Sequence, residues 1–126
     1  MDAHIYGLQI RVLLCHEEAE WVARALELDL LGYGRTQGEA IEALQEAIQA
    51  QLSFARQMND DTLLPFPSEP EYFKRWEEAQ NKAIRSQIMG DKGIKVKVRA
   101  VVIALSPDQL KSLRKQRFTQ TELACA

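Results

Sequence analysis

One amphipathic stretch, residues 36–58, constrains the fold of this chain more than any other feature. It opens with Thr36-Gln37-Gly38-Glu39, a capping box. In such a box the Thr36 hydroxyl accepts from the Glu39 N–H, and the Glu39 carboxylate accepts from the Thr36 N–H. Apolar residues then recur at helical spacing, at Ala40, Ile41, Leu44, Ala47, Ile48, Leu52 and Ala55. The pattern predicts a helix that ends near Met58 and buries one face.

The residues before this helix predict a β-hairpin. Residues 5–15 alternate, and one face carries Tyr6, Leu8, Ile10, Val12 and Leu14. Residues 16–20 form a polar connector of hairpin length, which favours a second strand over residues 21–30. Residues 23–27 also have good helix formers, so a helix there is the alternative. Gly32-Tyr33-Gly34 breaks the pattern.

A second helix is predicted after a proline-fixed apolar connector, residues 63–67. Ser68-Glu69-Pro70-Glu71 reads as another capping box. The helix that follows has an apolar stripe and closes near Gly90. The stripe consists of Tyr72, Phe73, Trp76, Ala79, Ala83 and Ile84.

Residues 94–105 predict a strand whose first half is exposed on one face and whose second half is buried on both. Ser106-Pro107-Asp108-Gln109 starts a last helix, with proline at its first position. The order is β-β-α-α-β-α, which predicts an α+β fold: an antiparallel sheet with helices packed on one face. Residues 1–58 are the hairpin-plus-helix core. Residues 59–126 are a helix-strand-helix extension that completes the same domain or forms an oligomer interface.

Charge is distributed unevenly along the 126 residues. Residues 1–91 carry 8 Lys/Arg and 16 Asp/Glu, a net charge of −8. Residues 92–126 carry 8 Lys/Arg and 2 Asp/Glu, a net charge of +6. An acidic body with a basic end indicates a partner for each, or two copies that meet across the divide. The alternative is that both ends are simply solvated.

The sequence also predicts a location. No apolar run approaches the roughly 20 residues that span a bilayer, and the N-terminus lacks the pattern of a signal peptide. We therefore expect a cytoplasmic protein with no membrane partner. Two distant cysteines do not form a disulfide framework, and Cys15 sits among apolar residues, as a buried small hydrophobe does.

Three catalytic or ligand sites were considered from the residues. A metal site would need Cys15, His16 and His4, but neighbours on a strand point to opposite faces. His4 and His16 as acid and base would be about 40 Å apart along one strand. Residues 32–36 could cradle a phosphate, but they lack the lysine of a P-loop. We expect no enzyme activity, no metal and no cofactor.

A family resemblance follows from residues 21–48. The matching segments are Trp21-Val22-Ala23, then Leu28-Asp29-Leu30-Leu31-Gly32-Tyr33-Gly34-Arg35-Thr36-Gln37-Gly38-Glu39-Ala40-Ile41, then Leu44 and Glu46-Ala47-Ile48. A hairpin, a leucine-aspartate turn and Gly-x-Thr-x-x-Glu-Ala opening a helix resemble the HicB-type antitoxin family over roughly residues 5–55.

The resemblance implies a partial double-stranded-RNA-binding-like fold that assembles into dimers or tetramers. It implies a non-catalytic protein that neutralises a small basic HicA-type toxin ribonuclease. The acidic residues 1–91 suit a basic partner, because complementary charge speeds encounter.

The C-terminal part departs from that family, whose DNA-binding members end in a helix-turn-helix or ribbon-helix-helix. Residues 95–118 supply one strand and one helix, with no second helix after them. The basic face of that last helix is the candidate nucleic-acid contact, formed by Lys111, Arg114, Lys115 and Arg117. Two alternatives therefore accompany the antitoxin hypothesis: a homo-oligomeric relative with a structural or regulatory role, and a nucleic-acid binder.

Overall fold

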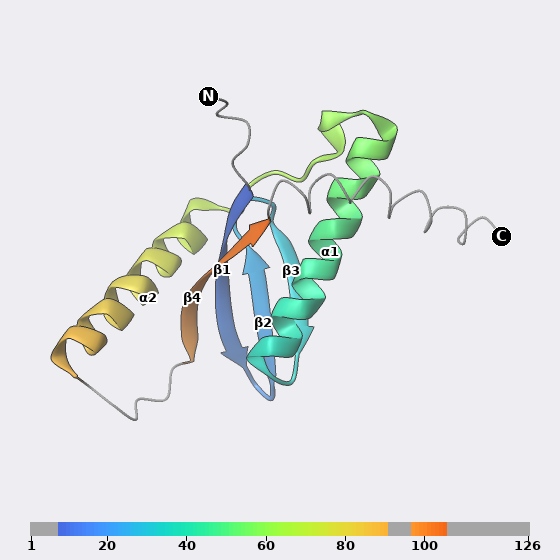
Figure 1. Cartoon of the computed structure of the whole chain (residues 1–126). Helices are drawn as coiled ribbons and strands as arrows, with labels where there is room; N and C mark the ends of the chain where they lie inside the picture. The colour runs from blue at the N-terminus through green and yellow to red at the C-terminus, as the bar shows by residue number, and fades with distance from the viewer. Residues whose placement is uncertain (1–7, 91–96, 106–126) are drawn as a thin grey trace.

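The computed structural model describes residues 8–90 and 97–105. Its elements are β1 (Leu8–Glu17), β2 (Glu20–Ala25), β3 (Leu30–Gly34), α1 (Gln37–Met58), the 3₁₀ turn η2 (Asp61–Leu63), α2 (Pro70–Met89) and β4 (Val98–Leu105). The four strands form one antiparallel sheet in the order β3-β2-β1-β4 (Figure 1). The predicted α+β class with an antiparallel sheet is confirmed. The last predicted helix lies outside the described residues.

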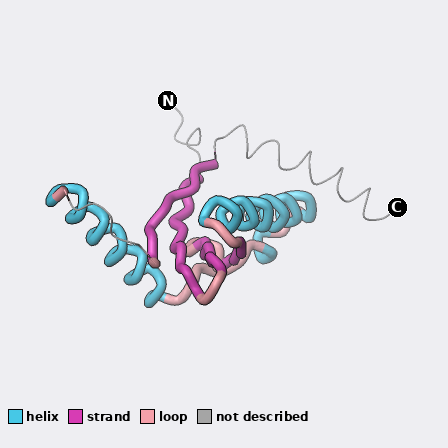
Figure 2. The backbone as a smooth tube through the Cα atoms, turned by 90° about the horizontal axis from the view of Figure 1, so that it is seen from below, coloured by secondary structure: helices cyan, strands magenta, loops and turns pink. Residues whose placement is uncertain are grey.

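The two helices pack on opposite faces of the sheet, so the expectation of helices on one face was wrong (Figure 2). The predicted alternation of β1 is confirmed, because Ile10, Val12 and Leu14 are fully buried beneath α1. On the other face Leu13 is also buried, in a cluster with Leu26 and Trp76. That second apolar face needs a cover of its own, and α2 provides it.

Sequence reasoning missed β3, because Gly32 and Gly34 were interpreted as a break. Both glycines lie in the strand and face α1, which packs directly against the backbone. A Cβ at Gly32 would lie 2.5 Å from the carbonyl oxygen of Ala40 and closer still to the backbone nitrogen of Leu44. A Cβ at Gly34 would lie 2.5 Å from the backbone nitrogen of Ala40. The glycines therefore permit close approach of a helix to a strand.

The predicted second strand, residues 21–30, is two strands joined by a turn. β2 ends at Ala25, and the turn contains Asp29 with a left-handed φ of 50°. Leu26 is still hydrogen-bonded to the carbonyl of Arg11, at 2.9 Å, so the chain leaves the ladder only after this residue. The Arg24 guanidinium pairs with Asp29 at 2.7 Å and closes the turn.

The helix α1 begins and ends as predicted. The Thr36 hydroxyl accepts from the Glu39 N–H at 3.1 Å, and Asn59 ends the helix in a left-handed conformation. The second half of the capping box differs, because the Glu39 carboxylate accepts from the N–H of Arg35, one residue earlier than predicted.

The predicted capping box at Ser68 was wrong. α2 has Glu69 at its N-cap without a side-chain bond, and Pro70 is its first residue. The Ser68 hydroxyl instead donates to Asp29 at 2.7 Å, so it ties the connector to the β2–β3 turn. The helix ends at Gly90 with φ 74°, as predicted.

The predicted strand over residues 94–105 is confirmed from Val98 onward, and it pairs with β1 along its whole length. The expectation that its second half is buried on both faces was wrong. Ile103 and Leu105 are buried under α1, but Val102 and Ala104 on the other face are exposed. The reason is that α2 contacts only the first half of that face, at Val98 and Ala100.

Candidate protein-binding surface

The β1–β2 turn and the start of α1 lie at the same end of the sheet (Figure 1). Trp21 pairs with Gly34 across β2 and β3, and Gly34 lies against Ala40 and Glu39 in the first turn of α1. At the base of the turn the rings of His16 and Trp21 are in contact, with their centroids 4.8 Å apart. The turn and the start of the helix therefore lie close to each other.

Six exposed carboxylates lie along the β1–β2 end of the sheet and the first half of α1. Glu18 lies in the β1–β2 turn, and Glu17 and Glu20 are the paired strand residues on either side of it, on the sheet face that carries Cys15. The other three lie on the outer side of α1, where the spacing of three and four residues puts them on one helix face. We call all six the acidic surface: Glu17, Glu18, Glu20, Glu39, Glu42 and Glu46.

The six carboxylates form no ion pair within the described residues, and a cationic group near the helix start, the Arg99 guanidinium, donates to Gln37 at 2.8 Å. The ion pairs at Glu27 and Asp29 are on the α2 side of the sheet, with Arg11 and Arg24. Acidic side chains without ion-pair partners give this end of the molecule a negative potential, which favours a cationic partner.

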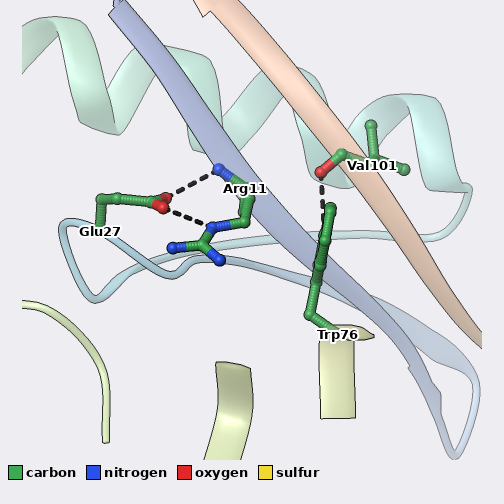
Figure 3. A network of polar contacts seen from close by, with 4 residues as sticks. All are labelled: Arg11, Glu27, Trp76 and Val101. Carbon is green, nitrogen blue, oxygen red and sulfur yellow. Dashed lines mark hydrogen bonds and ion pairs between the residues drawn. The ribbon is translucent and has the colours of Figure 1, made fainter. Parts of the chain in front are cut away.

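A second network of polar contacts lies under α2 (Figure 3). Its members are Arg11, Glu27, Trp76 and Val101. The Glu27 carboxylate accepts from the backbone N–H of Arg11 and from its Nε, each at 2.7 Å. The Arg11 guanidinium carbon lies 4.7 Å from the ring centroid of Phe73 and 5.8 Å from that of Trp76. The Trp76 Nε1–H donates to the Val101 carbonyl at 3.2 Å.

A second arginine repeats this arrangement at the start of α2. The Arg24 guanidinium lies 4.0 Å from the ring centroid of Tyr72, while its NH1 donates to Asp29. Each arginine is thus sandwiched between a carboxylate and an aromatic ring of α2, an arrangement that attracts through the ring quadrupole. These groups position the helix.

The residues weighed for catalysis are not brought together. Cys15 points to the α2 side, where Arg75 approaches its sulfur at 3.4 Å, and His16 stacks on Trp21 on the α1 side. The two side chains therefore point to opposite faces of the sheet, as expected for neighbours on a strand. Burial raises the pKa of the Cys15 thiol, against the opposing effect of Arg75. His4 lies outside the described residues.

Within residues 8–90 and 97–105, no group of three or more His, Cys, Asp or Glu side chains is arranged to hold a metal. The segment 32–36, considered as a phosphate cradle, contributes to β3 and the helix cap. Its glycines are explained by contact with α1.

The basic candidates Lys111, Arg114, Lys115 and Arg117 lie outside the described residues. Sequence reasoning did not single out the acidic surface residue by residue. Two signals pointed to it: the net charge of −8 over residues 1–91, and the helical spacing of Glu39, Glu42 and Glu46.

Comparison of the chain with models of known families, with curated protein sequences and with solved structures gave no match. Neither helix in the described part has the length and apolar character needed to cross a bilayer.

Proposed function

We propose that this chain is a non-catalytic, antitoxin-type protein that binds a small basic protein. The proposed partner is a toxin ribonuclease of the HicA type, and the proposed site is the acidic surface. The observation that carries the proposal is that six exposed carboxylates lie along the β1–β2 end and the first half of α1, and none of them is in an ion pair within the described residues.

Physical chemistry supports a basic protein as the partner. Complementary charge steers association and excludes like-charged competitors, and a cluster of acidic side chains on rigid elements keeps its field fixed in space. The α1 half of the cluster is rigid, since Ala40, Leu44 and Ile48 on the opposite side of the helix are fully buried. The resemblance of residues 5–55 to HicB-type antitoxins adds the class of partner.

The test is co-purification from the native host, with the chain expressed from its own locus together with the neighbouring reading frames. We expect a small basic protein to co-elute at low salt and to dissociate as salt rises. Expression of that protein alone should arrest growth and degrade messenger RNA, and co-expression with this chain should restore growth.

Matched variants assign the binding to the acidic surface. The triple variant Glu39→Gln, Glu42→Gln, Glu46→Gln removes three charges from α1 and should weaken the complex. The control variant Glu71→Gln, Glu77→Gln, Glu78→Gln removes three exposed charges from α2, including one in its first turn, and should bind as the wild type does. Equal affinity for both variants, or the absence of a basic partner, contradicts the proposal.

A further inference from the structure

The helix α2 crosses the sheet from its interior to one edge. Its side chains meet the strands in order: Tyr72 contacts β2, Phe73 contacts β1, and Trp76 donates to Val101 of β4. β4 is the last strand on that side of the sheet. The residues of α2 after Trp76 therefore extend past the sheet edge, as both views of the backbone show (Figures 1 and 2).

This overhang carries three large apolar side chains that the described chain leaves exposed. Met89 lies thirteen positions after Trp76, which corresponds to about 20 Å of helix. Ile84, Ile88 and Met89 are 46%, 76% and 75% exposed. Ile84 and Ile88 are four residues apart and so lie on the same side of the helix, where a partner could cover them.

Within residues 8–90 and 97–105, no strand pairs with the outer edge of β4 either. The Lys97 carbonyl accepts from the His16 N–H at 2.8 Å, so odd-numbered residues of this strand turn their backbone groups toward β1. The even-numbered residues turn theirs outward: Val98, Ala100, Val102 and Ala104. The strand has no proline or glycine, and its one charged residue is Arg99. Edges without such protection readily accept another strand.

We propose that a second copy of this chain binds here, with its β4 antiparallel to the first. The register that pairs the whole strand sets Ala100 opposite the partner's Val102 and Val98 opposite the partner's Ala104. Outward backbone groups then meet outward ones, as an antiparallel ladder requires. Val101 lies opposite the partner's Val101, on the two-fold axis. Arg99 meets the partner's Ile103, so no like charges are opposed.

The exposure pattern indicates a second copy as the occupant. The α2 overhang passes the Val98–Ala100 end of β4, where its own strand face is covered. In the proposed register, Val102 and Ala104 of the partner lie at that same end. These two are the residues of β4 that no described side chain covers on this face. The overhang of each copy would therefore cover the exposed half of β4 in the other copy. A single two-fold axis relates the two contacts.

The interface uses none of the six carboxylates of the acidic surface, so it goes beyond the proposed function and its test is independent. Light scattering on the purified full-length chain should show a dimer. Val102→Lys places a charge at the 48%-exposed edge position and should weaken dimerisation by at least about tenfold. The control is Tyr33→Lys, at a 53%-exposed position on the opposite edge, β3, which should leave the dimer intact.

Ile88→Glu is a second variant that cannot disturb folding through burial, since this side chain is 76% exposed. It should also weaken the dimer. A monomeric wild type overturns the proposal, whether the overhang is covered by the chain's own remaining residues or by a host protein. Dimers that survive both Val102→Lys and Ile88→Glu overturn it too.

The register has its own test in a background with Cys15→Ser and Cys125→Ser. Val101→Cys should form a disulfide between copies, because directly opposed residues of a non-hydrogen-bonded pair have Cβ atoms about 4.5–5.5 Å apart. Ala104→Cys is the control, since its counterpart would lie about 20 Å away along the ladder. Cross-linking through residue 104 and not through residue 101 would refute this register.

Discussion

The indole of Trp76 donates a 3.2 Å hydrogen bond to the carbonyl of Val101, joining the one buried side chain of α2 to the edge strand β4. The indole is 7% exposed and packs with Leu13 and Leu26. Because the rest of α2 is exposed or half-buried, the position of this helix depends largely on one side chain. The contacts of Arg11 with Phe73 and of Arg24 with Tyr72, near the start of α2, help to fix the orientation of the helix.

Replacing Trp76 should separate packing from hydrogen bonding. Trp76→Ala removes the whole side chain and should lower the free energy of unfolding by about 3–5 kcal/mol. Trp76→Phe keeps an aromatic ring but loses the donor, and should cost about 1–2 kcal/mol. Urea denaturation at one fixed protein concentration measures both, because any self-association would make stability depend on concentration. Equal costs for the two variants would mean that the ring retained in Trp76→Phe contributes no stability at this position.

The close approach of α1 to β3 predicts opposite effects for two glycines. Gly32→Ala should destabilise by about 3 kcal/mol or more, since its Cβ meets backbone atoms of Ala40 and Leu44 that no rotamer change can move. Gly38→Ala lies in the first turn of α1, where the nearest atom is the Thr36 hydroxyl at 3.9 Å. It should stabilise by up to about 1 kcal/mol. Thermal unfolding of the two variants checks the contrast, and a tolerated Gly32→Ala contradicts it.

Glu27 should stabilise the fold more by accepting a hydrogen bond from the Arg11 N–H than through its charge. Both side chains of the Arg11–Glu27 pair are about a third exposed, at 39% and 31%, so Glu27→Gln should cost only about 0.5–1 kcal/mol. Glu27→Ala also leaves the Arg11 N–H without its acceptor and should cost about 1–3 kcal/mol. Chemical denaturation measures the difference. Glu42→Ala, an exposed residue with no described partner, is the control and should be neutral.

The elements with strong periodicity were predictable from the sequence. The alternation of β1 and the capped, striped α1 agree with the structure, because local pattern and tertiary packing favour the same conformation in each. β3 was missed because Gly32 and Gly34 oppose strand formation locally. Only the helix that comes within contact of their backbone makes glycine the suitable residue there.

The placement of α2 could not be predicted for a different reason. Its apolar stripe indicates a buried face but does not identify which side of the sheet receives it. That choice depends on Leu13 and on Leu26, which lies in a turn, and the two meet only once the sheet has formed. The acidic surface was predictable as a charge excess, whereas its location required the proximity of the β1–β2 turn to the first turn of α1.

The thiol of Cys15 should titrate above its ordinary pKa of 9.0, because burial disfavours the thiolate. The folded state then holds the proton more tightly than the unfolded chain does. The resulting stabilisation is fully present below pH 9 and is lost as the pH rises through the folded-state pKa. Alkylation rates against pH, measured in a Cys125→Ser background, should show a higher midpoint in the folded protein than in urea.

The neighbouring charges should move that midpoint in opposite directions. The Arg75 guanidinium, 3.4 Å from the sulfur, favours the thiolate, so Arg75→Ala should raise the pKa of Cys15 further and slow alkylation at a given pH. Glu17 disfavours the thiolate, so Glu17→Gln should lower the pKa. A midpoint in the folded protein at or below that in urea would show that solvent reaches the sulfur freely and that α2 does not cover it.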